Sequence, residues 1–385
     1  MDRKKSFLTV IIIAVAIKLF LFAFAVIRVP QSKFADVDST KYWQTAQVLY
    51  TRGAFATEGS GGALKYETFR TPGYPVFLSF LHYLLKIPFD WVILFQVLLT
   101  ICAAFITYRA ALTIDRGIAF LSAAVVLFDP PISIFSLMIM AESLSLFGIA
   151  LFIFSFILYL KNGEISFIIL SALLLSLSTY VKPIGYYLGG VIVIFIVYAN
   201  IPKSFKKSFL HAFVFFIVVY SLLGIWQLRN YERCKKTSFS TVAEANFRQN
   251  TLIGSYAGNN DRFSQGLAPV PYYITVTARC LLRFMTSPGS FKYFQNFSLS
   301  IVGMIAGYLW MVFWLIGFCM GVVKTRRNIY YQFLVLVIVY FAAVTVISAG
   351  WAAKERLRIP IVPAIAMIAA YGWISRSSFM RRHFS

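Results

Sequence analysis

The chain has 385 residues, of which 59% are hydrophobic, 18% are aromatic and only 13% are charged. Soluble domains carry about 25% charged residues, so this composition excludes an ordinary water-soluble protein. The formal net charge is +22. Because Lys and Arg stand at the ends of apolar runs, this charge indicates membrane topology and contact with anionic phosphates or lipids. We therefore expect a lipid bilayer around the protein and no nucleic acid among its partners.

Apolar runs of about 20 residues, long enough to cross a bilayer, recur along the chain. They predict an all-α polytopic membrane protein of about ten transmembrane helices, with 1–385 as a single domain. The first run is longer than a signal-peptide core of about 7 to 15 residues, so we interpret it as a retained helix. The run at 117–129 is short, which predicts a broken or tilted helix that continues past Pro130-Pro131. The predicted helices are 7–28, 91–111, 117–129, 138–160, 165–181, 185–201, 209–228, 297–322, 330–350 and 359–375.

Basic residues of the short connections fall on the side of the N-terminus. Under the positive-inside rule they predict that both termini are cytoplasmic, in a multi-pass protein of the cytoplasmic (inner) membrane. Two long polar segments, 29–90 and 229–296, then lie on the extracytoplasmic face. The first has helical spacing at 39–52 and an apolar stretch at 75–87 that suits the membrane surface, so we expect an ordered loop with juxtamembrane helices.

The four cysteines do not have the close spacing of a zinc site. Cys234 and Cys280 lie in the second polar segment, where they could form a disulfide in an oxidising compartment or remain two thiols.

Two groups of residues in the first polar segment could carry chemistry. Asp36 and Asp38 follow the first helix, and a carboxylate near a membrane surface can act as a general base or bind a metal ion. Either Asp could instead cap the helix that begins near 39. Further along, the run from 69 to 75 contains two prolines and a glycine, which predict a rigid turn that would position Arg70 and Tyr74. The alternative is a plain turn with an interfacial tyrosine.

Other ionisable residues lie near the ends of helices on the same predicted face. They are Glu142, Lys182, Arg229, Arg356 and Arg358. An ionisable residue at membrane depth is costly and usually has a partner or a function, although each cation could simply extend its head group to the membrane surface. The positive-inside rule does not account for cations on this face. Together they could bind a phosphate or diphosphate through charge-assisted hydrogen bonds.

In their order along nearly the whole chain, these motifs resemble the GT-C superfamily of polyprenyl-phosphate-sugar-dependent membrane glycosyltransferases. The resemblance is to the branch of the protein O-mannosyltransferases and the lipid A aminoarabinose transferase. The matching motifs are Asp36 and Asp38 with Tyr42, Arg70 to Pro75, Glu142-Ser143, Lys182-Pro183, Trp226 to Tyr231, and Arg356 to Pro360.

The resemblance implies an inverting transferase that moves a hexose or pentose from a polyprenyl-phosphate donor to an extracytoplasmic glycan, lipid or protein acceptor. Asp38, or else Asp36, would be the general base. Lys182, Arg229, Arg356 and Arg358 would bind the donor phosphate. The residues implied for positioning the loop and the sugar are Arg70, Tyr74, Tyr42 and Glu142. A divalent cation stays open as cofactor. Larger relatives have a soluble outer domain, so we expect acceptor recognition here from the two outer segments or from a partner.

An alternative hypothesis is a secondary transporter or flippase for a lipid-linked or anionic solute, which also needs buried charges. The ionisable residues gather at one face rather than at the membrane midplane, and the sequence shows no internal repeat. Both observations favour the enzyme. Lys18, inside the first apolar run, is the exception. A third hypothesis is a scaffold subunit that keeps the fold without the activity.

Overall fold

The structure is a computed structural model that describes residues 3–29, 36–201, 204–250, 270–288, 297–324, 328–349 and 353–383. Its longer helices are α1 (Arg3–Arg28), α2 (Val37–Arg52), α4 (Phe89–Ile114), α5 (Ala119–Leu127), α7 (Glu142–Asn162), α8 (Ile165–Val181), α9 (Leu188–Asn200), α10 (Phe205–Cys234), α11 (Val242–Asn250), α13 (Val270–Thr286), α14 (Phe297–Lys324), α15 (Ile329–Ala349) and α17 (Val362–His383). The shorter elements are β1 (Ala56–Glu58), η2 (Ser60–Gly62), β2 (Leu64–Tyr66), α3 (Gly73–Leu78), η3 (Ser79–Leu84), α6 (Pro130–Phe135), η4 (Pro183–Gly185), α16 (Glu355–Arg358) and η8 (Ile359–Ile361).

Eight helical segments of the described chain are long and apolar enough to cross a membrane. In addition, α8 is an apolar helix of 17 residues. The predicted break in the third helix is confirmed, because α5 ends at Leu127 and α6 begins at Pro130 with Asp129 as its N-cap. These helices confirm an all-α polytopic membrane protein.

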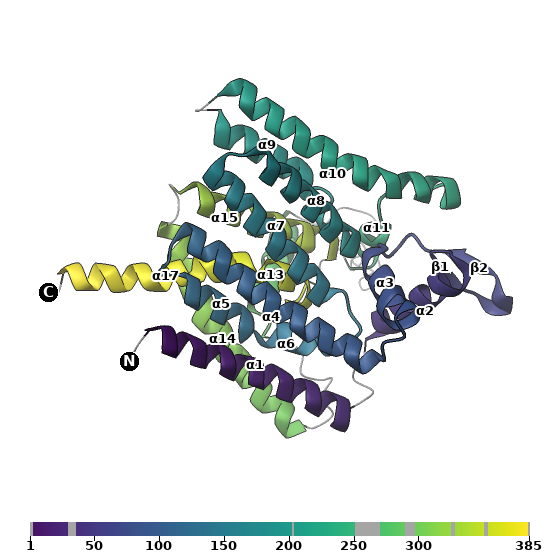
Figure 1. Cartoon of the computed structure of the whole chain (residues 1–385), viewed down its shortest axis with the longest axis horizontal. Coiled ribbons are helices and arrows are strands. Elements are labelled where there is room, and N and C mark those ends of the chain that lie inside the picture. Colours follow the sequence, from purple (N-terminus) through teal and green to yellow (C-terminus); the bar gives the residue numbers. More distant parts are fainter. Residues whose placement is uncertain are drawn as a thin grey trace.

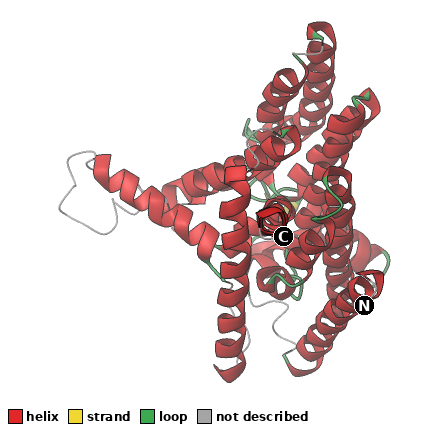
Figure 2. Cartoon of the chain, turned by 90° about the vertical axis from the view of Figure 1, so that its left-hand side faces the viewer, coloured by secondary structure: helices red, strands yellow, loops and turns green. Residues whose placement is uncertain are grey.

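Both chain ends lie at the same end of the molecule. They are at the left of Figure 1 and on the side that faces the viewer in Figure 2. The elements α2, α3, β1 and β2 lie at the opposite, right-hand end of Figure 1. This arrangement agrees with a first outer segment placed opposite the termini.

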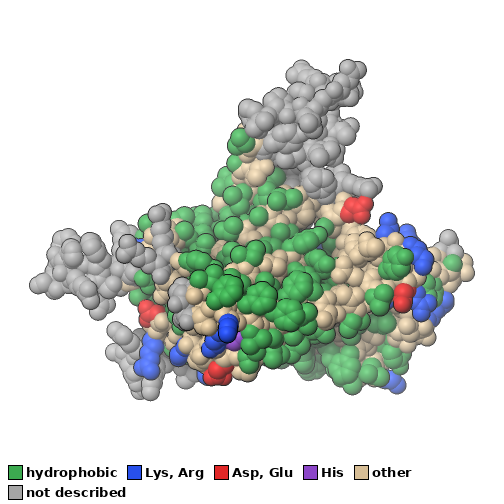
Figure 3. All heavy atoms as spheres, turned by 90° about the horizontal axis from the view of Figure 1, so that it is seen from above, with side chains coloured by type: hydrophobic (Ala, Val, Ile, Leu, Met, Phe, Trp, Pro, Cys, Tyr) green, Lys and Arg blue, Asp and Glu red, His purple; other side chains and the backbone are tan. Residues whose placement is uncertain are grey.

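An apolar surface runs between the two ends. Figure 3 shows hydrophobic side chains across the middle of one face, with charged side chains toward its left and right ends. On α10 the exposed apolar residues include Phe209, Phe213, Ile217 and Ile225. A continuous apolar surface of this kind matches the hydrocarbon layer of a bilayer.

The centre of the bundle contains the segment that leads into α17. In an 18-residue apolar window of Glu355–Ile374, 78% of the residues are buried, whereas only 17% are buried in the corresponding window of Thr9–Arg28. The helices α14 and α17 approach so closely that a Cβ on Gly372 would clash with the carbonyl oxygen of Gly317. Small residues allow such contacts between membrane helices. This packing holds α16, directly before α17, in a defined place.

The first outer segment folds as predicted at 39–52 and 75–87, where α2 and then α3 with η3 form. It also contains an antiparallel hairpin in which Ala56 of β1 faces Tyr66 of β2. The sequence does not predict this hairpin, because strands of three residues are too short to show an alternating pattern.

The length of α10 differs from the sequence prediction, and the state of two cysteines is resolved. The helix α10 continues to Cys234, past the predicted end at 228. Cys234 and Cys280 are both free thiols. Of the second outer segment, 251–269 and 289–296 lie outside the described residues.

Candidate functional site

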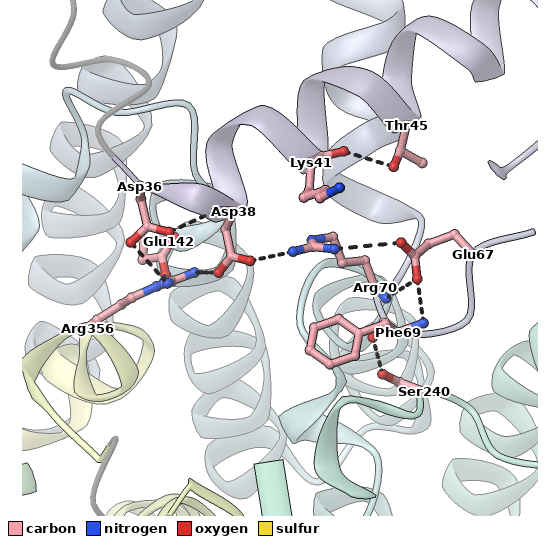
Figure 4. A network of polar contacts seen from close by, with 10 residues as sticks. All are labelled: Asp36, Asp38, Lys41, Thr45, Glu67, Phe69, Arg70, Glu142, Ser240 and Arg356. Carbon is pink, nitrogen blue, oxygen red and sulfur yellow. Dashed lines mark hydrogen bonds and ion pairs between the residues drawn. The ribbon is translucent and has the colours of Figure 1, made fainter. Parts of the chain in front are cut away.

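The two acidic residues of the first outer segment have different surroundings. Asp36 is the N-cap of α2, and its carboxylate accepts a hydrogen bond of 2.9 Å from the backbone N–H of Asp38. The Asp38 carboxylate is free of the cap and meets two guanidinium groups. Its Oδ1 accepts from Arg70 Nη2 at 2.5 Å, and its Oδ2 accepts from Arg356 Nη2 at 2.8 Å (Figure 4).

The turn that carries Arg70 docks against the end of α8. Thr71 Oγ1 donates to the carbonyl oxygen of Val181 at 3.0 Å. Gly73 lies so close to α8 that a Cβ there would be 2.8 Å from the carbonyl carbon and oxygen of Tyr180. A glycine is therefore required for this approach. The docking brings Arg70 to the same end of the bundle as Lys182, the residue that follows α8.

A second carboxylate completes the network around Arg356. Glu142, the first residue of α7, is buried, and its Oε1 accepts from Lys182 Nζ at 2.8 Å and from Arg356 Nε. Arg356 Nη1 also lies 3.6 Å from Asp36 Oδ2. Together with Asp38 and Arg70, the network thus joins carboxylates and cations from segments distant in the sequence. The predicted convergence of these residues is present in the structure.

The protonation of Asp38 is set by burial and by its two arginines. Burial by itself would raise the pKa of the Asp38 carboxyl, but the guanidinium groups of Arg356 and Arg70 outweigh it and bring the pKa below its usual value. Asp38 is therefore ionised at neutral pH.

The network opens into a pocket of about 930 Å³. Asp36, Asp38, Tyr42, Arg70, Lys182 and Arg356 line it. Other parts of its wall are aromatic or carry hydroxyl groups, among them Tyr186, Tyr187, Phe239 and Ser240. Pockets of roughly 300 to 1,000 Å³ with a few converging polar groups are typical of small-molecule sites.

The Tyr42 ring contacts both Arg70 and Tyr74. The guanidinium carbon of Arg70 lies 5.5 Å from the ring centre of Tyr42, whose ring meets that of Tyr74 edge to face at 4.9 Å. Tyr74 is fully buried and donates from its hydroxyl to Gln96 Oε1 at 2.5 Å. Sequence reasoning missed Gln96. A lone amide inside the apolar run at 91–111 is the signal that could have found it.

Arg229 lies outside the network. Its Nη1 donates to the carbonyl oxygen of Glu67 at 2.8 Å, and its Nη2 donates to that of Phe55 at 2.7 Å. Its guanidinium carbon also lies 4.7 Å from the ring centre of Trp226. Arg229 therefore joins α10 to the hairpin and to the turn that leads to Arg70.

Arg358 is also separate from the network. It is buried, and it donates to the carbonyl oxygens of Phe284, Met285 and Ser287 at 2.6 to 2.9 Å. These carbonyl groups stand at the C-terminal end of α13, where helical partners are lacking. Arg358 thus fastens α13 to α16.

Lys18, the ionisable residue within the first span, is buried and donates to Ser133 Oγ of α6 at 3.0 Å. It is not among the residues that line the pocket. Within the described ranges, no group of three or more His, Cys, Asp or Glu side chains is arranged to hold a metal ion.

Comparison of the sequence with known protein families and with curated proteins finds no match. Among solved structures, the oligosaccharyltransferase of Archaeoglobus fulgidus in its apo form is 14% identical with a TM-score of 0.60, over 99% of this chain and 52% of that chain. The same archaeal oligosaccharyltransferase, AglB, in complex with an inhibitory peptide and a dolichol-phosphate is 13% identical with a TM-score of 0.57, over 99% and 51%. A form tethered to an acceptor peptide that contains the NVT sequon is 13% identical with a TM-score of 0.60, over 99% and 50%.

This chain therefore spans about half the length of the oligosaccharyltransferase chains that it matches. Identities this low show a common fold alone. Nearly the whole chain shares its fold with about half of the archaeal oligosaccharyltransferase chain, in line with the resemblance drawn from its motifs.

Proposed function

We propose that the protein is an inverting membrane glycosyltransferase. It transfers a sugar from a polyprenyl-phosphate-linked donor to a hydroxyl group of an extracytoplasmic glycan, lipid or protein. The observation that carries this proposal is the pocket that places the Asp38 carboxylate beside Arg356 and Lys182. A fold shared with an enzyme whose structure was obtained with a dolichol-phosphate supports a lipid-linked donor.

The reaction needs a base for the acceptor and positive charge for the leaving group. The acceptor hydroxyl gives its proton to Asp38, and its oxygen forms a bond to the anomeric carbon of the sugar. On the opposite face the bond from that carbon to the phosphate oxygen breaks, and its electron pair stays with the polyprenyl phosphate. Lys182 and Arg356 stabilise the charge that develops on this phosphate.

The other predicted site residues support these groups. Arg70 orients Asp38. The Tyr42 ring packs against the guanidinium group of Arg70, and the Tyr74 ring packs against Tyr42. Glu142 holds Lys182 and Arg356 together. Asp36 is the second choice as base, but its bond to the backbone N–H of Asp38 makes it primarily a helix cap.

Mass spectrometry of surface glycans and lipids tests the proposal in cells with and without the gene. We expect loss of a hexose or pentose mass in the deletion strain, and its return with the wild-type gene but not with Asp38→Asn. Glu58→Gln, which removes an exposed carboxylate of the hairpin outside the pocket, is the matched control and should restore the mass. Full activity of both Asp36→Asn and Asp38→Asn would contradict the mechanism.

A further inference from the structure

Both carboxylate oxygens of Asp38 are already bound. Oδ1 accepts from Arg70 and Oδ2 accepts from Arg356, at 2.5 and 2.8 Å. Charge-assisted hydrogen bonds of this kind are among the strongest in proteins. Each carboxylate oxygen keeps a second lone pair, but two guanidinium groups lower the affinity of the carboxylate for a proton. Release of one guanidinium group would therefore make Asp38 a stronger base.

Arg70 is the more deeply buried of the two. Its side chain is 12% exposed, its guanidinium carbon lies 5.2 Å from the ring centre of Phe69, and its Nη1 lies 3.6 Å from Glu67 Oε2. Glu67 Oε1 in turn accepts from the backbone N–H of Arg70 at 3.3 Å. The main chain of Arg70 is therefore held in place, and its side chain is less exposed than that of Arg356.

Arg356 has more freedom and a place to move to. Its side chain is 24% exposed, twice the fraction of Arg70, and it lines the pocket beside Lys182. Its Nη1 lies 3.6 Å from Asp36 Oδ2, the same distance that separates Arg70 Nη1 from Glu67 Oε2, so neither contact is a direct hydrogen bond. Only Nη2 must separate from Asp38, while Nε can keep its bond to Glu142 as a pivot.

We propose that Arg356 changes partner in each catalytic cycle, from the Asp38 carboxylate to the phosphate of the lipid donor. The phosphate receives Nη1 and Nη2 of Arg356, and Asp38 Oδ2, without its guanidinium partner, becomes the stronger acceptor for the proton of the acceptor hydroxyl group. This inference rests on the proposed function and adds an order to it, because the base is released only after the donor has bound.

The charges of the network fit this exchange. Asp36, Asp38 and Glu142 form ion pairs with Arg70, Lys182 and Arg356, and Arg70 also faces Glu67. A phosphodiester donor adds one negative charge, and the proton that moves from the acceptor to Asp38 neutralises one. Charge that is unbalanced at low dielectric is costly, so the exchange lowers this cost at the step where the sugar is transferred.

The test measures the affinity of the protein in nanodiscs for a short-chain polyprenyl monophosphate without a sugar, with the neutral polyprenol as control ligand. If Asp38 and the phosphate compete for Arg356, Asp38→Asn should tighten binding on the order of tenfold, the value of one charge-assisted hydrogen bond. Asp36→Asn removes the same charge in the same pocket and should tighten binding less, because its contact with Arg356 is longer. In a protein that also carries Arg356→Gln, Asp38→Asn should tighten binding of the phosphate no more than Asp36→Asn does by itself.

The results separate the exchange from the function. An equal gain from Asp36→Asn and Asp38→Asn, or a large gain that persists with Arg356→Gln, would overturn the exchange alone. Absence of polyprenyl phosphate binding in wild type and variants would contradict the proposed function itself. Asp38→Ser provides a second neutral variant, should the Asn protein fail size-exclusion and melting controls.

Discussion

The guanidinium groups of Arg70 and Arg356 both lower the pKa of the Asp38 carboxyl. Because they bring the pKa of the folded protein's Asp38 below its usual value, this carboxylate contributes stability above its unfolded pKa. That contribution is lost as the pH falls through the folded pKa. The same pairing keeps Asp38 ionised, and therefore able to act as a base, in mildly acidic surroundings.

Removing Arg70 should narrow the working pH range. Arg70→Gln deletes a cation whose Nη2 lies 2.5 Å from Asp38 Oδ1, so the pKa of Asp38 rises and the acid limb of sugar transfer moves to higher pH. The rate of transfer measured against pH checks this shift. Lys41→Gln removes an exposed cation from α2, the helix that carries Asp38, and should leave the acid limb in place. Equal shifts in both variants would indicate a general effect of net charge.

At the scale of the elements, hydrogen bonds join the two polar segments, 29–90 and 229–296. Ser240 Oγ donates to the carbonyl oxygen of Phe69 at 2.6 Å, and the backbone N–H of Thr241 donates to that of Thr68 at 2.9 Å. Asn230 on α10 donates to the carbonyl oxygen of Phe239 at 3.1 Å. Together with the contacts of Arg229, these bonds attach the turn that carries Arg70 to the end of α10.

Arg229→Ala should loosen the first outer segment. The substitution removes two hydrogen bonds to backbone carbonyl groups, and a loss of about 1.5 kcal/mol would increase the open population roughly tenfold. Trypsin cleavage after the exposed Arg52 and Lys65 measures that population. Arg233→Ala, one turn further along α10, removes an arginine that lies over the Tyr66 ring and should change cleavage little. Cleavage unchanged by Arg229→Ala would show that other contacts hold the segment.

At the scale of the whole molecule, the two termini lie at one end and α2, α3 and the hairpin lie at the other (Figure 1). We predict that the pocket faces the outside and both termini face the cytoplasm. In a protein without its natural cysteines, Lys41→Cys should react with a membrane-impermeant maleimide on intact cells. Lys161→Cys, in the exposed last turn of α7, should react only after the membrane is permeabilised. The opposite pattern of labelling would reverse the proposed orientation.

Much of this architecture can be predicted from the sequence, because a bilayer imposes long apolar runs that are visible without any partner. The convergence of Asp38, Arg70, Glu142, Lys182 and Arg356 follows from placing helix ends on one side of a membrane. The same reasoning cannot separate a cation that faces a pocket from one that binds carbonyl groups. Arg229 and Arg358 therefore have roles that only tertiary contacts reveal.

The length of α10 bears on the proposed lipid donor. Its 30 residues make a helix of about 45 Å, whereas a hydrocarbon core is about 30 Å thick. Under the proposed function, this excess would let a lipid donor present its phosphate beside the pocket while its chain remains in the hydrocarbon. We then expect a thicker or thinner bilayer to change the distance between that phosphate and Arg356.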